Sequence, residues 1–259
     1  MIDHSAKEQA VEPITYLTEA IRVLQHIQEN NAVIRTVADK AAETIARGNW
    51  VRLFGSGHSV LPTQDCFPRY GGYVGFYPIM DPRLMWTTVS GPGGAEELLW
   101  LERQENYINV FLRHNTWDAN DMLIVVSHGG QNPAPVEMAL AGKEAGLFVV
   151  AITSEDNHRN KPATHSSGKK IGDIADITIF NGVSSEDAVV SVPGVAGKVG
   201  GVSTLASIAI IQSIVSETAL GLAQRGYKVK PFAAPNVEGL GPRHNEEVYE
   251  EFRSRLNRS

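Results

Sequence analysis

The stretch Trp50-Val51-Arg52-Leu53-Phe54-Gly55-Ser56-Gly57-His58-Ser59 decides the fold class, because a short apolar run passes directly into a loop of small and polar residues. A second stretch repeats this pattern: the apolar run 122–126 is followed by Ser127-His128-Gly129-Gly130-Gln131-Asn132. Both runs are typical of buried strands, and both loops lead toward helical patterns. Such a strand–loop–helix corner gathers backbone N–H groups and hydroxyls at a helix N-terminus, where an anion is stabilised. Two corners predict one phosphate-bearing ligand at the carboxyl ends of a parallel sheet.

Strands and helices alternate on both sides of these corners. Strands are predicted at 50–54, 74–79, 121–127, 147–153 and 175–180, and helices at 14–46 (broken at Asn30-Asn31), after Ser59, and at 95–105, 134–145, 202–225 and 244–256, with a polar loop at 154–170. The pattern predicts an α/β fold: a three-layer, doubly wound parallel sheet of the flavodoxin-like type, with an N-terminal helical lead and long C-terminal helices. Residues 1–48 are expected to pack on the sheet or on a partner subunit, and 49–259 to form one structural unit with a C-terminal helical extension.

Composition excludes several classes of protein. The 259 residues carry a net charge of −6 with both signs interspersed, which argues against a nucleic-acid binder. The single cysteine, Cys66, permits neither a disulfide within the chain nor a cysteine zinc site, and it fits a reducing, cytoplasmic location. No apolar run reaches the ~20 residues of a membrane span, so no membrane partner is expected. The histidines have no metal-ligand spacing, and no metal site is predicted.

Two nucleotide motifs fit poorly. Val60 stands where a dinucleotide fingerprint has its third glycine, although Asp81 lies at a plausible distance for a ribose contact, which keeps a nicotinamide enzyme open. No Walker lysine follows either loop, and Ser127 does not stand in a Gly-x-Ser-x-Gly nucleophile elbow.

The two loops resemble the sugar isomerase (SIS) domain, and more closely the uncharacterised SIS-domain subgroup called UPF0309. Three later segments support the subgroup: Pro135 to Leu140, Lys198 to Thr204, and Asn236 to Gly239 with His244-Asn245. The resemblance covers nearly the whole chain from the first helix onward. It implies an SIS-type fold and phosphosugar binding. The family includes aldose–ketose isomerases, an etherase of N-acetylmuramic acid phosphate, and phosphosugar-sensing domains of transcription regulators.

The chain departs from the family pattern at two places. The second loop usually reads Ser-x-Ser-Gly, and here Gly129 replaces the second serine, so that one phosphate hydroxyl is missing. The first helix often carries paired glutamates where this chain has Gln64-Asp65. Phosphosugar binding is still expected, with altered contacts.

The candidate ligand-binding residues come from the two corners and from the start of the long apolar helix. They are Ser56, Gly57, His58, Ser59, Ser127, His128, Gly129 and Asn132, with Ser203 and Thr204 as a third phosphate wall and Lys198 supplying charge. The alternative for the serines and the threonine is that they only cap the helices that follow.

Four residues are candidates for acid–base chemistry. Glu97, slightly preferred, and Glu96 follow a glycine-rich loop, where a carboxylate suits enolisation, although acidic residues are also common in a first helical turn. Glu217 lies in an apolar helix, where an unpaired carboxylate is costly, so it is expected to reach the cleft or a partner. His244 either reaches the site or caps a helix on the surface.

The leading hypothesis is a cytoplasmic phosphosugar enzyme that interconverts an aldose and a ketose through an enediol. A base and an acid suffice for this chemistry, so no cofactor is expected. A lyase or etherase, which would remove the same proton, and a non-catalytic phosphosugar sensor are the alternatives. The expected partners are a small sugar phosphate and a second copy of the chain, in a homodimer or higher homo-oligomer.

Overall fold

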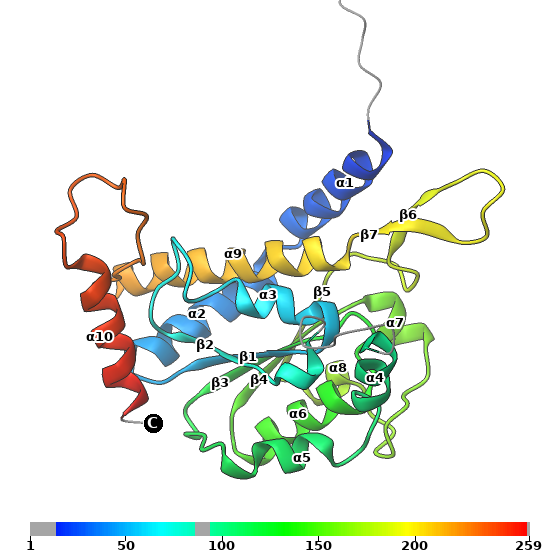
Figure 1. Ribbon diagram of the computed structural model, residues 1–259, viewed down its shortest axis with the longest axis horizontal. Coiled ribbons are helices and arrows are strands. Elements are labelled where there is room, and N and C mark those ends of the chain that lie inside the picture. The colour runs from blue at the N-terminus through cyan, green and yellow to red at the C-terminus, as the bar shows by residue number, and fades with distance from the viewer. Residues whose placement is uncertain (1–13, 86–93, 258–259) are drawn as a thin grey trace, which may run out of the picture.

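The computed structural model describes residues 14–85 and 94–257, and it contains a five-stranded parallel sheet between two layers of helices (Figure 1). The strand order is β2-β1-β3-β4-β5. The strands are β1 (Val51–Gly55), β2 (Phe76–Ile79), β3 (Met122–Val126), β4 (Phe148–Thr153) and β5 (Ile177–Phe180). All neighbouring pairs are parallel, which confirms the predicted α/β fold with a parallel sheet flanked by helices.

Helices cover both faces of the sheet. One layer contains α1 (Thr15–Glu29), α2 (Ala32–Ala46), α3 (Val60–Gln64) and α9 (Ser203–Gln224), and the other contains α4 (Gly94–Leu101), α5 (Tyr107–Phe111), α6 (Pro133–Glu144) and α8 (Ile171–Ile174). Strands β1 and β3 are buried along their whole length, because each is covered on both faces. Helices α1 and α2 share one core with α9 and the sheet, so the N-terminal helices pack on the sheet.

The strand order fixes where a ligand is expected. From β1 the chain passes through α3 to β2 at one edge, and it then returns to β3 on the other side of β1. Strands β1 and β3 are therefore neighbours whose following helices, α3 and α6, lie on opposite faces of the sheet. In such sheets ligands bind in the crevice outside the carboxyl ends of these two strands.

Helix α9 is the one helix of the described ranges that is long and apolar enough to cross a membrane by length and composition. Half of its most apolar window is buried inside the structure, where it packs on α1, α2 and α3. This arrangement is typical of a core helix, as the sequence predicted.

The structure differs from the sequence prediction in several segments, and the short helices α5 and α8 lie where no helix was predicted. The polar segment 154–170, predicted as a loop, contains the short helix α7 (Glu155–Asn160), whose N-cap Ser154 accepts a hydrogen bond from the N–H of Asn157. A hairpin that was not predicted, β6 (Ala188–Ser191) and β7 (Lys198–Gly201), precedes α9. The helix predicted at 95–105 ends at Leu101.

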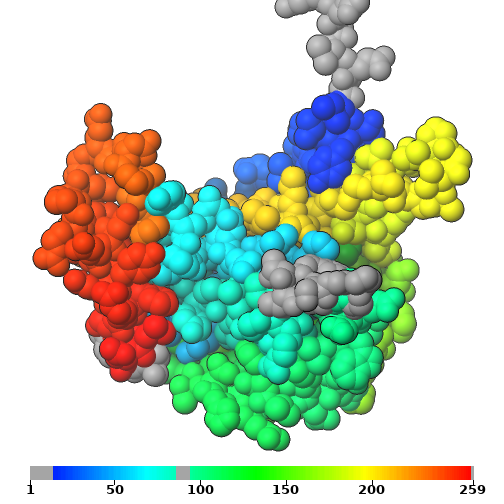
Figure 2. Space-filling model, in the orientation of Figure 1, coloured from blue at the N-terminus to red at the C-terminus, as the bar shows by residue number. Residues whose placement is uncertain are grey.

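Helix α1 and the β6–β7 hairpin lie at one end of α9, and helix α10 (His244–Leu256) lies at the opposite end. Helix α1 and the β6–β7 hairpin contact each other and stand out beside the start of α9 (Figure 2). Helix α10 lies at the other end of α9, where Arg255 donates a hydrogen bond to the hydroxyl of Tyr227 at 3.1 Å.

Candidate functional site

The first corner, at the carboxyl end of β1, is a tight turn that requires glycine. A Cβ at Gly55 would lie 2.1 Å from the carbonyl oxygen of Ser59, because the chain folds back on itself here. Gly57 has a φ of 58°, in the left-handed region that favours glycine. The alternation Gly-Ser-Gly is thus a requirement of the backbone, and it turns residues 57–59 into a short 3₁₀ helix ahead of α3.

This corner opens onto a cavity of about 160 Å³. The cavity is lined by side chains from four separate segments: His58, Ser59 and Pro62; His128; Asp187; and Ser203, Thr204 and Ser207. Five of the predicted ligand-binding residues therefore face one space, which lies between α3, the second corner and the start of α9. No Lys or Arg is among the lining residues.

Asp187 lines this cavity and was missed by the sequence analysis. Its Oδ1 accepts hydrogen bonds from the backbone N–H groups of Val202 (2.9 Å) and Ser203 (2.7 Å), at the N-terminus of α9. A Cβ at Gly201 would lie 3.0 Å from Oδ2, so that glycine permits the approach of the carboxylate. The one sequence signal for this contact is the glycine pair Gly200-Gly201 before α9, because glycine allows another group to approach the backbone closely.

His128 brings the second corner to the cavity. Its Nδ1 lies 3.3 Å from Nδ2 of Asn181, an amide that can only donate, so Nδ1 is the acceptor and Nε2 carries the proton of the neutral ring. Nε2 is buried, with no hydrogen-bond partner among the described residues. Burial lowers the pKa of His128, while the negative charge of Asp187 opposes part of this shift. The ring is therefore neutral at physiological pH.

The other residues of the second corner stabilise the loop itself. The hydroxyl of Ser127 accepts the N–H of Gly130 at 3.1 Å. Gly130 has a φ of 67°, and a Cβ there would lie 2.6 Å from Oγ1 of Thr153, so that glycine is required. Gly129 is different, because the nearest neighbour of an added Cβ would be Cγ of Gln131 at 4.0 Å. The space at position 129 would admit the serine that the family loop usually carries there.

The helix that follows the second corner offers few donors for an anion. Pro133 and Pro135 have no N–H group, and the N–H of Ala134 donates to the carbonyl oxygen of Glu102 at 3.0 Å. The first turn of α6 therefore lacks the free N–H groups that make a helix N-terminus an anion site.

Glu102 joins the two corners from the opposite face of the sheet, and it too was missed. Its Oε2 accepts the hydroxyl of Ser56 at 2.8 Å, and its Oε1 accepts Nδ2 of Asn132 at 2.7 Å. The residue is only 7% exposed, and burial raises the pKa of its carboxyl above the usual range. Ser56 and Asn132, both predicted as ligand contacts, are thus held by a buried carboxylate.

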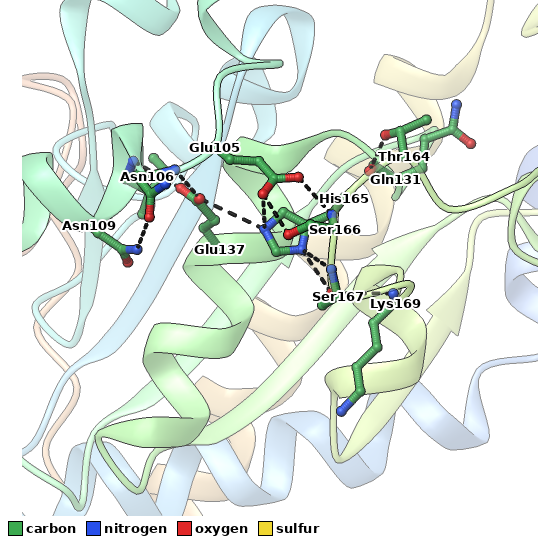
Figure 3. Close-up of polar contacts among 11 residues, drawn as sticks. Glu105, Asn106, Asn109, Gln131, Glu137, Thr164, His165, Ser166, Ser167 and Lys169 are labelled. Atoms are coloured by element: carbon green, nitrogen blue, oxygen red, sulfur yellow. Dashed lines mark hydrogen bonds and ion pairs between the residues drawn. The ribbon is translucent and has the colours of Figure 1, made fainter.

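A polar cluster braces the second corner from outside (Figure 3). Thr164 donates its hydroxyl to the carbonyl oxygen of Gln131 at 2.7 Å, and the next residue, His165, lies between two carboxylates, with Nε2 3.9 Å from Glu105 and 3.8 Å from Glu137. Glu137 accepts the N–H groups of Asn106 and Ile108, so this buried carboxylate stabilises the start of α5. The cluster fixes the loop but does not line the cavity.

Comparison with known proteins identifies the family. A family model for the SIS domain matches residues 15–154. The UPF0309 protein BH0227 of Halalkalibacterium halodurans is 35% identical over 93% of this chain and 95% of its own length. The UPF0309 protein GK1441 of Geobacillus kaustophilus is 32% identical over 90% of both chains. The chain belongs to the SIS-domain family and to its UPF0309 subgroup. This confirms the resemblance of the two loops and the later segments.

A solved structure supports the fold alone. The phosphoheptose isomerase GmhA from Neisseria gonorrhoeae superposes with a TM-score of 0.51 at 14% sequence identity, covering 79% of this chain and 95% of that one. The shared part is the SIS-type sheet with its flanking helices.

None of the four acid–base candidates lines the cavity of this SIS domain. Glu96 and Glu97 are exposed on the first turn of α4, in the layer on the other face of the sheet. Glu217 lines a separate hollow between α9 and the α1–α2 turn, together with Arg35. It does not reach the cleft, because it lies almost four turns from the start of α9.

His244 and Lys198 also lie away from the cavity. Nε2 of His244 is 2.7 Å from the carbonyl oxygen of Pro231, and α10 packs beyond the C-terminal end of α9. That helix has 22 residues, so about 33 Å separate its two ends. Lys198 is exposed on β7, with its Nζ 3.7 Å from Glu186 of the same hairpin. Neither residue is among those that line the cavity.

Two further observations concern other kinds of site. A larger cavity, of about 430 Å³, lies at the α1–α2 turn beside the edge strand β5 and contains none of the predicted site residues. Within residues 14–85 and 94–257 no group of three or more His, Cys, Asp or Glu side chains is arranged to hold a metal ion.

Proposed function

We propose that this SIS domain binds a sugar phosphate in the cavity between the two corners and interconverts its aldose and ketose forms. The observation that carries the proposal is the convergence of His58, Ser59, His128, Ser203 and Thr204 on one cavity at the carboxyl ends of β1 and β3. Hydroxyls and the neutral imidazole of His128 suit the hydroxyl-rich surface of a sugar phosphate. GmhA, to which the chain is similar in fold, is a phosphoheptose isomerase, an enzyme of the same chemical class.

The proposed reaction begins with removal of the proton alpha to the carbonyl of the open-chain sugar. A carboxylate takes the proton from C2, the C–H electron pair forms the C1=C2 bond, and the carbonyl pair moves onto O1, which takes up a proton from an acid to give the enediol. The O2 hydroxyl then loses its proton to form the C2 carbonyl, and the C1=C2 pair takes the carboxylate's proton at C1 to give the ketose, so no cofactor and no metal ion are required. Glu97 and, next to it, Glu96 are the bases proposed from the sequence, and Asp187 is the carboxylate that lines the cavity.

We also propose that the protein acts as a homodimer in the cytoplasm. Four apolar side chains of the α1 segment face solvent: Ile14, Leu17, Ile21 and Leu24 are 39–65% exposed. Their spacing of three, four and three residues puts them on one face of the helix, and burial against a second copy would remove this apolar surface from water. Helix α1 contacts β6, so a second subunit bound to this face of α1 would lie close to the N-terminal end of α9.

The test is a thermal-shift screen of sugar phosphates and amino-sugar phosphates, followed by proton exchange in deuterated water. A ligand that binds the folded state raises Tm by mass action, and an isomerase or an etherase exchanges the proton alpha to the carbonyl. Release of the C3 substituent would identify a lyase or etherase. A ligand that binds tightly without exchange in the wild-type protein would make the domain a sensor and refute the enzymatic proposal.

Matched substitutions identify the base. Glu97→Gln keeps the shape of the side chain and removes its basicity, so exchange should fall by about 10²–10⁴-fold while binding persists. Glu96→Gln tests the neighbouring candidate on the same exposed turn, and if it abolishes exchange instead, the base is Glu96. If exchange survives both substitutions, the base lies elsewhere, and the carboxylate of Asp187 is the next to test.

A further inference from the structure

The N-terminus of α9 already holds an anionic group, the carboxylate of Asp187. The sequence had assigned this place to the ligand phosphate, with Ser203 and Thr204 as its third wall. In the structure Oδ1 of Asp187 accepts the first two N–H groups at this helix start, those of Val202 and Ser203. A protein carboxylate therefore occupies the site where the helix dipole favours negative charge.

The position of Asp187 is fixed by the backbone on both sides. Its φ of 67° lies in the left-handed region, which Asp and Asn adopt more readily than most residues. Its own N–H donates to the carbonyl oxygen of Ser184 at 3.0 Å, and the close approach of Gly201 leaves space for Oδ2. The carboxylate is thus held in one orientation, with Oδ1 committed to α9.

The surroundings of Asp187 decide what it can bind. Within the described part of the chain the lining residues include no Lys or Arg, and burial lowers the pKa of His128, which keeps this ring neutral. A phosphate placed beside this carboxylate would be repelled at short range without a compensating charge. A hydroxyl or an ammonium group would instead donate a charge-assisted hydrogen bond to it.

We infer that Asp187 sets the direction of the ligand: it binds the hydrogen-bond-donating, unphosphorylated end of the sugar at the start of α9 and directs the phosphate toward the first corner, residues 55–59. This rests on the proposed function, which it extends from a sugar phosphate in general to one orientation of it. Ser203 and Thr204 then contact sugar hydroxyls, and Ser59 contacts the phosphate. In a 6-phosphate the carbons that exchange protons lie at the Asp187 end.

The experiment compares wild type with Asp187→Asn by calorimetric titration. Asn keeps an Oδ1 that accepts both N–H groups of α9 and tolerates the left-handed backbone, so the variant retains the helix cap and loses only the charge. The probes are glucose 6-phosphate, glucosamine 6-phosphate, N-acetylglucosamine 6-phosphate and inorganic phosphate. Glu186→Gln is the matched control, because it removes the same charge one residue away, on an exposed side chain that does not line the cavity.

Asp187→Asn should weaken the best-bound sugar phosphate by about 10- to 100-fold, the loss expected for one or two charge-assisted hydrogen bonds. Inorganic phosphate should bind as well or better, since the repelling charge is gone, and Glu186→Gln should change neither. A larger loss for glucosamine 6-phosphate than for glucose 6-phosphate assigns the donor as an ammonium group, and equal losses assign it as a hydroxyl.

Two results would overturn the inference, and they differ from each other. If Asp187→Asn weakens inorganic phosphate as much as the sugar phosphates, Asp187 acts only by holding α9 in place, although the proposed function stands. If the wild-type protein binds none of the four probes, the proposed function fails and the inference falls with it. The unfolding temperature of each variant, measured in the same buffer without ligand, shows that the fold is intact.

Discussion

Replacing Glu102 tests whether one buried carboxylate holds the two corners of the site together. Glu102→Ala removes the acceptor of the Ser56 hydroxyl (2.8 Å) and of the Asn132 amide (2.7 Å). Each partner left without a hydrogen bond costs about 1–3 kcal/mol, so the free energy of unfolding should fall by about 2–5 kcal/mol. Glu102→Gln can accept from Asn132 with Oε1 and donate to Ser56 with Nε2, so its loss should stay within about 1 kcal/mol.

The pH dependence of the stability of Glu102→Gln is a second, independent test of the role of Glu102. Burial raises the pKa of Glu102, so the folded protein binds this proton more tightly than the unfolded chain does. The stability contributed by this carboxyl is fully present below the ordinary glutamate pKa of about 4.3, and it is lost as the pH rises through the raised value. Glu102→Gln cannot ionise, and its stability relative to wild type should therefore improve between pH 4 and pH 7.

Urea denaturation at several pH values, followed by circular dichroism, measures both effects. Glu105→Gln is the contrasting variant, because hydrogen bonds from Ser166 hold the pKa of this exposed carboxyl below its usual range, and its stability relative to wild type should therefore fall as the pH rises toward the ordinary glutamate pKa. The reasoning is refuted if Glu102→Ala is as stable as wild type, or if the stability of Glu102→Gln relative to wild type falls with rising pH. Ligand binding should follow the same order: kept in the glutamine variant and weakened in the alanine variant, in which both corners are released.

Three further predictions concern the ligand and the assembly. Gly129→Ser should leave sugar-phosphate binding unchanged by calorimetry, because the position has room for a side chain but does not line the cavity; stronger binding would place the phosphate at the second corner. Ser59→Ala should weaken binding by about tenfold, since its side chain lines the cavity, whereas Ser127→Ala should mainly lower Tm, since its hydroxyl accepts the N–H of Gly130; the reverse pattern would move the phosphate to the second corner. Light scattering should show a dimer that Leu17→Glu with Ile21→Glu converts to a monomer, and a wild-type species of 28.1 kDa at micromolar concentration would contradict the assembly.

The sequence was informative wherever local patterns decide local structure. The apolar runs before the two corners form the central strands β1 and β3. A run of five mostly apolar residues is typical of a parallel strand that is buried on both faces. The hairpin before α9 was missed because its two strands are only four residues each, and glycine or proline interrupts the segment that joins them. Short, partly exposed strands carry a weak alternation of polar and apolar residues.

The two carboxylates of the site were missed for a different reason. Glu102 lies inside the helix predicted at 95–105 and Asp187 stands in the polar run Ser184-Ser185-Glu186-Asp187, so neither differs in sequence from an ordinary solvated acid. What distinguishes them is contact with residues distant in sequence: Ser56 is 46 positions from Glu102, and Ser203 is 16 positions from Asp187. Glu96 and Glu97 attracted attention because they follow a glycine-rich loop, but position along the chain does not say which face of the sheet a helix covers.

The prediction that the ligand phosphate binds at a helix N-terminus meets an obstacle at two helices, for reasons that only the tertiary structure shows. At α6 two prolines remove N–H groups, and the remaining one of the first three donates to the carbonyl of Glu102. At α9 the carboxylate of Asp187 takes the place of the ligand. A phosphate bound in this cavity must then depend on hydroxyls and on the backbone of the first corner, which donate weaker hydrogen bonds than a lysine or an arginine would. Selectivity should therefore come from the sugar end of the ligand rather than from its phosphate, and inorganic phosphate should compete poorly with a correctly oriented sugar phosphate.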